Sequence, residues 1–203
     1  MRLSPKKILV LTLIVALAVP VWVGAAEAPV TRLSGADRYA TAVAISKEGW
    51  SYSGAVVIAR GDDYADALAG VPLAYRLVAP ILLTAPGRLP AVTRQEILRL
   101  NAFNAIILGG SNAVSDDVAD ALRAMGLEVE RIAGKDRFDT AVRIASRLAP
   151  NGVNTAIVAS GRNFPDALAA APYAAVAGYP ILLVERASVP SVVTNAVKEL
   201  GVT

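Results

Sequence analysis

The sequence predicts an α/β fold in which two tandem copies of one module each carry an open parallel sheet. Residues 32–43 recur at 131–142, which is 99 positions later, and residues 61–83 recur at 161–183, which is 100 positions later. Repetition at this period is typical of tandem modules. Short apolar segments also alternate with amphipathic ones along the chain. This alternation predicts right-handed strand–helix–strand crossovers and three-layer α/β modules.

Short segments rich in Val, Ile, Leu and Ala are predicted to be strands. Nearly continuous apolarity over about five residues is typical of strands that are buried on both faces of a parallel sheet. The predicted strands are residues 55–59, 80–84, 105–108, 127–132, 155–159 and 180–184. The amphipathic segments between them are predicted to be helices, at residues 37–47, 63–78, 90–100, 115–125, 136–148, 163–177 and 190–200.

Residues that start, end or break helices support these assignments. Asp37 and Asp136 stand where N-cap residues are expected, and Gly126 stands where a helix is expected to end. Pro72 and Pro172 fall inside predicted helices. Because proline removes a backbone hydrogen bond and clashes with the preceding turn, each of these two helices is predicted to be split or kinked.

Residues 1–26 predict a secretory signal peptide. Three basic residues precede an apolar run at 8–23, and small residues follow it, so we expect cleavage after Ala26. An uncleaved membrane anchor is the alternative interpretation. The apolar run is slightly short of the roughly 20 residues that a spanning helix needs. We therefore expect a secreted protein that has no membrane contact after cleavage.

Charge and composition exclude several classes of function. The chain has 20 basic and 17 acidic residues, and the predicted leader contains three basic and no acidic ones, so the rest is balanced at 17 of each. Nothing therefore predicts a nucleic-acid partner. The chain contains neither Cys nor His, which excludes a disulfide framework, a Cys/His zinc site, a Cys nucleophile and a Ser-His-Asp triad. No cofactor, metal site or catalytic residue is predicted.

The repeat predicts two modules after the leader, at residues 27–130 and 131–203, which we call the first and second copies. In the alignment of the copies, Thr203 corresponds to Phe103, just before the predicted strand at 105–108. The second copy is therefore predicted to be incomplete, without its last strand and helix. A sheet edge left open in this way would favour a homo-oligomer or contact with further modules.

Repeated polar residues cluster directly after predicted strands, where ligands bind in open parallel sheets. Arginines and helix N-termini in such loops predict a site for anionic groups. The candidate ligand-binding residues are Asp37, Arg38, Arg60, Ser111, Asn112, Asp136, Arg137 and Arg162.

Other roles for some of these loops stay open. Asp63 and Asp66 have the spacing of a helix capping box, and Arg38 and Arg137 could pair with carboxylates of a neighbouring loop. The loop at 109–113 follows a predicted strand and opens a helix, as a phosphate loop does. It lacks the third glycine of a dinucleotide-binding motif and the lysine of a Walker loop, so it gives only weak support for a dinucleotide enzyme.

Several motifs recur in register between the two copies. They are Arg-hydrophobic-small-Gly-x-Asp-Arg at 32–38 and 131–137, Asp-Ala-Leu-Ala at 66–69 and 166–169, and Pro-Ile-Leu-Leu at 80–83 and 180–183, and the first copy adds Gly-Gly-x-x-Ala-Val-Ser at 109–115. Together these motifs resemble the cell wall-binding repeat 2 family of Gram-positive bacteria, and the resemblance covers residue 32 to the end of the chain.

This resemblance implies tandem Rossmann-like or flavodoxin-like modules that attach S-layer and other cell-surface proteins non-covalently to anionic secondary polymers of the wall. It also implies that residues 80–83 and 180–183 are the family's Ile-Leu-Leu motif, which we interpret as buried strands rather than ligand contacts. Family modules usually come in threes about a pseudo-threefold axis, whereas two are predicted here.

The sequence thus predicts a secreted, non-catalytic module at the cell wall or cell surface. Its expected partner is an anionic polysaccharide or a teichoic-type polymer, bound without a cofactor. One alternative is an N-acetylmuramoyl-L-alanine amidase, or an amidase modifier, that acts on peptidoglycan. Another is a structural surface-layer protein without a specific ligand.

Overall fold

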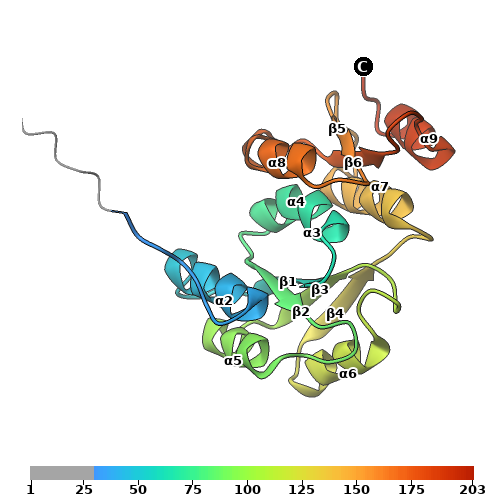
Figure 1. The fold of residues 1–203 in the computed structure, drawn as a ribbon. Coiled ribbons are helices and arrows are strands. Elements are labelled where there is room, and N and C mark those ends of the chain that lie inside the picture. Colours follow the sequence, from blue (N-terminus) through green and yellow to red (C-terminus); the bar gives the residue numbers. More distant parts are fainter. Residues whose placement is uncertain (1–29) are drawn as a thin grey trace, which may run out of the picture. The chain divides into compact units, whose positions relative to one another are not determined.

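Parallel strands form two separate sheets in a computed structural model that describes residues 30–203 (Figure 1). The first sheet has the order β2-β1-β3-β4, and the second pairs β5 with β6. The strands are β1 (Ala55–Arg60), β2 (Ile81–Thr84), β3 (Asn104–Leu108), β4 (Glu128–Ile132), β5 (Ile157–Ser160) and β6 (Ile181–Val184). The predicted parallel α/β fold is confirmed. The predicted signal peptide lies outside the described residues.

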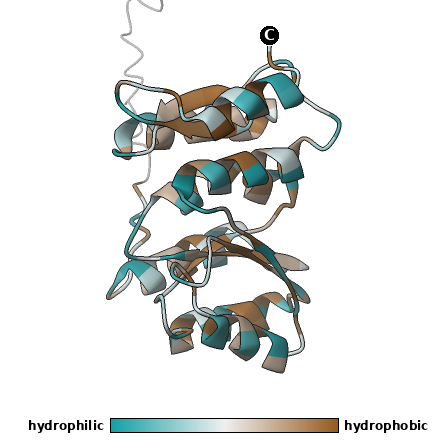
Figure 2. Ribbon diagram, turned by 90° about the vertical axis from the view of Figure 1, so that its right-hand side faces the viewer, coloured by the Kyte–Doolittle hydropathy of each residue, from teal (hydrophilic) through white to brown (hydrophobic). Residues whose placement is uncertain are grey.

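Helices cover both faces of the first sheet. A buried apolar cluster lies on each face. On one face the sheet packs against α2, α5 and α6, and on the other it packs against α3, α4 and α7. The helices are α2 (Arg38–Gly49), α3 (Ala65–Ala69), α4 (Val71–Arg76), α5 (Ala91–Leu100), α6 (Asp116–Ala124), α7 (Arg137–Leu148), α8 (Pro165–Ala177) and α9 (Ser191–Glu199). The second of these clusters also includes Leu182 of β6 and Ala167 of α8, so both copies share it. Figure 2 shows the resulting layers of strands and helices.

The capping residues identified in the sequence do what their spacing predicts. Asp37 accepts a hydrogen bond from the backbone N–H of Ala40 at 2.8 Å. Asp136 accepts from the N–H groups of Phe138 and Asp139, both at 2.9 Å. Gly126 has a φ of 89°, a left-handed conformation that glycine adopts without strain at a helix end. These caps set the starts of α2 and α7 and the end of α6.

The two equivalent prolines have different effects. In the first copy the helix is split as predicted, because α3 ends at Ala69 and α4 begins at Val71 just before Pro72. In the second copy the helix is not split, because α8 runs as one helix from Pro165 to Ala177 with Pro172 inside it. The residues differ just before the proline: Gly70 in the first copy is replaced by an alanine in the second. Alanine favours the helical conformation by about 1 kcal/mol over glycine, which helps α8 to continue.

β4 ties the second copy to the first sheet. It contains residues 130 and 131, the predicted boundary between the copies, and it pairs with β3 so that Leu108 lies opposite Ile132. The fourth strand of the first sheet is therefore the segment that leads directly into α7. In residues 30–203 no helix is long and apolar enough to cross a membrane.

Candidate binding site at the carboxyl ends of the strands

The topology of the first sheet creates a crevice between β1 and β3. The chain leaves β1 toward α3 on one face of the sheet, and it leaves β3 toward α6 on the opposite face. Loops diverge at such a switch point, which is the usual ligand position in an open parallel sheet. A cleft of about 220 Å³ lies there, between the loops after β1 and β3 and the start of α7.

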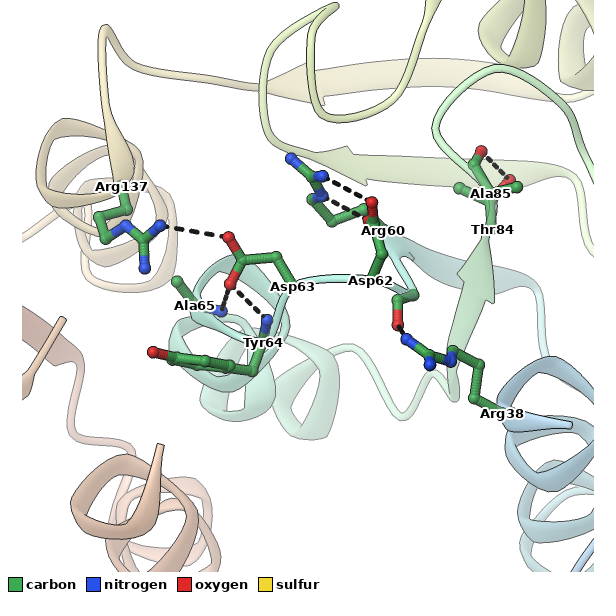
Figure 3. Close-up of polar contacts among 10 residues, drawn as sticks. Arg38, Arg60, Asp62, Asp63, Tyr64, Ala65, Thr84, Ala85 and Arg137 are labelled. Atoms are coloured by element: carbon green, nitrogen blue, oxygen red, sulfur yellow. Dashed lines mark hydrogen bonds and ion pairs between the residues drawn. The ribbon is translucent and has the colours of Figure 1, made fainter. Parts of the chain in front are cut away.

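The loop after β1 supplies one wall of this cleft. Arg60 forms a two-point ion pair with Asp62, with distances of 2.7 and 2.8 Å (Figure 3). One oxygen of Asp63 accepts from the N–H of Tyr64, the residue just before α3, at 2.7 Å. Its other oxygen accepts from Arg137 at 3.2 Å. Asp63 therefore links the loop after β1 to α7 of the second copy.

The equivalent arginines of the two copies make the same backbone contact. Arg38 donates to the carbonyl oxygen of Gly61 at 2.5 Å, and Arg137 donates to that of Gly161 at 2.8 Å. Each arginine thereby fixes the loop that follows the first strand of its own copy. Both side chains therefore have a structural role, which is to hold these loops in place.

Asp66 lies under the loop that follows β3. It is partly buried, and burial raises the pKa of its carboxyl, as does the neighbouring carboxylate of Asp63. Gly109 has a φ of 101°, and a Cβ added there would lie 2.6 Å from an oxygen of Asp66. Glycine is therefore required at this position both by the backbone conformation and by the close approach of Asp66.

The start of α7 supplies the opposite wall. Gly134 donates its N–H to the hydroxyl of Thr140 at 3.0 Å, and Lys135 donates its own to Asp139 at 2.9 Å. These bonds fold the loop back onto the first turn of the helix. The Lys135 side chain is exposed and has no ion pair with any residue in the described part of the chain. Among the residues that the structure describes, it is therefore the basic side chain of the cleft that has no acidic partner.

The cleft is polar and mixed in charge rather than strongly positive. Its charged lining residues are Arg60, Lys135, Arg137, Asp63, Asp66 and Asp136. Ser111 and Asn112 also line the cleft, and both residues are exposed. No group of three or more acidic side chains that could hold a metal ion occurs in residues 30–203. Such a lining can recognise a ligand through charge and hydrogen bonds.

Five of the eight candidate residues come together in this cleft: Arg60, Ser111, Asn112, Asp136 and Arg137. The other three lie elsewhere. Asp37 caps α2, and Arg38 borders a neighbouring cleft beside Asp62. Arg162 pairs with Glu185 at 2.8 and 2.5 Å and lies 5.7 Å from the ring centre of Phe138.

Two residues that build the site were not singled out from the sequence. Arg131 donates to the carbonyl oxygens of Gly109 at 3.1 Å and Val114 at 2.7 Å, so it holds the loop after β3. Its repetition as Arg32 was the signal that could have identified it. Lys135 replaces an alanine of the first copy. Comparison of the copies selects repeated residues, so a residue present in only one copy is missed even where it gives that copy a different site.

Replacing Gly134 by alanine is expected to lower the free energy of unfolding by about 2 kcal/mol, because overpacking against fixed backbone is destabilising. The added Cβ would lie 2.5 Å from backbone atoms of Asp139 and Thr140 in the first turn of α7. Gly110→Ala is the matched control, since nothing lies within 4 Å of a Cβ at that position. Urea unfolding of both variants measures the difference. Equal stability would mean that the loop moves away at little cost.

The fold and the cleft together define a class of protein: tandem-repeat α/β modules with a polar cleft at the switch point of an open parallel sheet. Comparison of the sequence with known families gives the particular family. The profile of cell wall binding domain 2 matches residues 32–119 and 131–202, which is most of the chain. The chain belongs to this family, as the repeated motifs predict.

Relatives with known roles are longer proteins. The N-acetylmuramoyl-L-alanine amidase LytC of Bacillus subtilis is 39% identical over 178 residues, which are 88% of this chain and 36% of LytC. The amidase enhancer of the same organism is 42% identical over 159 residues, which are 78% of this chain and 22% of the enhancer. The chain thus spans about a third or less of these two relatives.

Solved structures agree with the fold. Cwp6 from Clostridium difficile matches with a TM-score of 0.80 and 36% identity, over 86% of this chain and 28% of Cwp6. Cwp8 from the same organism matches with a TM-score of 0.75 and 35% identity, over 82% of this chain and 29% of Cwp8.

Proposed function

We propose that this chain is a non-catalytic module that attaches a cell-surface protein non-covalently to an anionic secondary polymer of the cell wall. The observation that carries this proposal is the cleft between β1, β3 and α7, where the exposed Lys135 forms no ion pair with any of residues 30–203. Membership of a cell wall binding family supports the location at the wall and the polymeric partner.

The cleft has the donors that a phosphate or carboxylate group needs. Lys135 offers an exposed ammonium group, and Arg137 donates from two of its guanidinium nitrogens, to Gly161 and Asp63. The pair with Asp63 is 3.2 Å long and partly exposed. Because ion pairs of this kind contribute only about 1 kcal/mol or less, an incoming anion can compete with Asp63 for the guanidinium group. Each site would bind weakly, and repeated modules would add avidity.

Co-sedimentation with purified walls tests the proposal. We expect the protein to sediment with native walls and to stay in solution after hydrofluoric acid has removed the secondary polymer. Salt should weaken the binding, because exposed charges are screened over about 8 Å at physiological ionic strength. Equal sedimentation with stripped peptidoglycan would contradict the proposal.

A pair of lysine variants tests the site itself. Lys135→Ala is expected to reduce the fraction bound to native walls. Lys198→Ala removes the same charge from an exposed position on α9, outside the cleft, and should leave binding unchanged. Unfolding curves of both variants should match the unmodified protein, because neither side chain has a core contact. If both variants lose binding equally, net charge rather than the cleft determines attachment.

A role in peptidoglycan hydrolysis is the second candidate function, and identity with LytC and the amidase enhancer favours it. Release of labelled fragments from peptidoglycan, measured with this protein alone and then with an added amidase, distinguishes the functions. Release by this protein alone would indicate hydrolysis, and an increase only with the amidase would indicate a modifier.

A further inference from the structure

A hollow lies at the amino ends of the strands of the first sheet, at the edge opposite the cleft described above. It has a volume of about 380 Å³. The first residues of β1, β3 and β4 line it, together with Leu77 just after α4 and Arg147 in the last turn of α7. It shares no lining residue with the cleft that contains Lys135. The two are therefore separate features of the same sheet.

The register of the parallel strands brings acidic and apolar side chains together in this hollow. Ala55 lies opposite Asn104, and Asn104 lies opposite Glu128, so these three residues form one row across the sheet. In a second row on the same face, Ile106 lies opposite Glu130. Side chains two residues apart on a strand share a face, and Ile106 belongs to the buried cluster on the side of α7. Both glutamates are therefore on the face that α7 covers.

The apolar core on this face ends before the first row. In a third row, Leu108 lies opposite Ile132, and both side chains are buried. Glu128 and Glu130 hold the corresponding positions nearer the start of β4, and both are exposed. The hollow therefore has apolar side chains on its inner side and carboxylates on its outer side.

One of these two carboxylates has no basic partner in the described part of the chain. Arg147 donates to the two oxygens of Glu130 at 2.9 and 3.3 Å. Glu128 forms no ion pair with any of residues 30–203. Arg76, at the end of α4, donates to the carbonyl oxygen of Leu148 and does not line the hollow. The charged lining residues are thus two acids and one base, which leaves a net negative charge.

We propose that this hollow binds a primary ammonium group on a short alkyl stem, such as the side chain of a lysine or of another diamino acid. Glu128 accepts from the ammonium group, and the side-chain oxygen of Asn104 beside it is a second acceptor. The stem packs against Ala55, Leu77 and Ile106. A metal ion suits the hollow less well, because no group of three or more acidic side chains that could hold one occurs in residues 30–203.

NMR titration of the isotopically labelled protein with two small probes tests the proposal. The first probe is Nα-acetyl-lysine amide, and the second is Nα-acetyl-norleucine amide, which has the same alkyl stem without the ammonium group. We expect the lysine probe to shift the signals of the Glu128 backbone amide and the Asn104 side-chain amide. The norleucine probe should bind at least about threefold more weakly, which is the effect of one partly exposed ion pair. Salt should weaken binding of the lysine probe alone.

Two glutamate variants are matched, and a third variant closes the hollow. Glu128→Gln removes the charge and keeps the shape, so it should weaken binding of the lysine probe by at least about threefold. Glu48→Gln makes the same change at an exposed position on α2, outside the hollow, and should leave binding unchanged. Ala55→Leu places a larger side chain in the hollow and should abolish binding of both probes. The glutamate variants decide the question even if Ala55→Leu unfolds the protein.

Several results would overturn the proposal. Equal binding of the two probes would show that the ammonium group is not recognised, and equal losses in both glutamate variants would show that net charge alone attracts the lysine probe. Stronger binding of glucosamine, whose ammonium group has no alkyl stem, would contradict the role of the apolar side. β4 is also the last strand of its sheet in residues 30–203, and charged residues on an edge strand hinder pairing with other chains. If that is the only role of the glutamates, neither probe will shift the signals of the hollow.

Discussion

Leu82→Ala is expected to lower the free energy of unfolding by about 2–5 kcal/mol, because it removes buried methyl groups and leaves a cavity. Leu82 lies in β2 in the predicted Ile-Leu-Leu motif and is completely buried, as is its equivalent Leu182 in β6. The same change at Leu182 should therefore have an effect in the same range. Burial of both leucines supports the interpretation of this motif as core strand.

Leu98→Ala is the control for these two variants. It makes the same chemical change on α5, where the leucine is 61% exposed. Surface changes of this kind usually alter stability by no more than about 0.5 kcal/mol. Urea unfolding of all three variants provides the comparison. A loss of wall binding by Leu82→Ala without any loss of stability would mean that the motif contacts the ligand directly.

Arg99→Ala is expected to lower the free energy of unfolding by about 3 kcal/mol, because it leaves a buried carboxylate without its charged partner. The Glu96 side chain is completely buried, and Arg99 donates to it at 2.8 and 2.7 Å. Ser46 of α2 donates to the same carboxylate at 2.5 Å. Replacing both partners by apolar residues, Glu96→Leu with Arg99→Met, should recover most of the loss. If the double variant is no more stable than Arg99→Ala, the pair itself is what stabilises the fold.

The same pair makes stability depend on pH. Burial alone raises the pKa of Glu96, but the hydrogen bonds from Arg99 and Ser46 outweigh it and hold the pKa below its ordinary value. A carboxyl group of this kind stabilises the fold above its unfolded pKa of about 4.3, and the contribution is lost as the pH falls through the folded pKa. The unmodified protein should therefore lose stability below about pH 4 by more than Glu96→Gln does. Urea midpoints measured from neutral to acidic pH check the sign.

The elements of the fold could be predicted because local residues determine them. The apolar segments around Ile58 and Leu182 are too continuous to lie on a solvated surface, and Asp37 and Asp136 satisfy backbone donors within their own first turns. Local residues did not predict that the helix breaks before Pro72 but continues through Pro172. The proline is the same in both copies, and the outcome depends on the residues around it.

The candidate site could be predicted only in part. Parallel strands bring their carboxyl ends to one edge, so the loops around Arg60, Ser111 and Asp136 were expected to meet there, and they do. Spacing alone does not show which charges neutralise each other. The bond from Arg137 to Asp63 joins residues 74 positions apart. It depends on how α7 packs against the loop after β1. Spacing likewise does not show that Lys135 has no ion pair among residues 30–203.

The position of β4 has a consequence for how such a protein grows by duplication. The period of the sequence and the boundaries of the folded layers are out of phase, because the segment just ahead of α7 completes the sheet of the preceding copy. A gene duplication that inserts one whole period would therefore add, with each new unit, the fourth strand of the sheet of the unit before it. Units joined in this way share a sheet instead of folding independently. Removing one unit would take away the edge strand of the sheet in the unit before it.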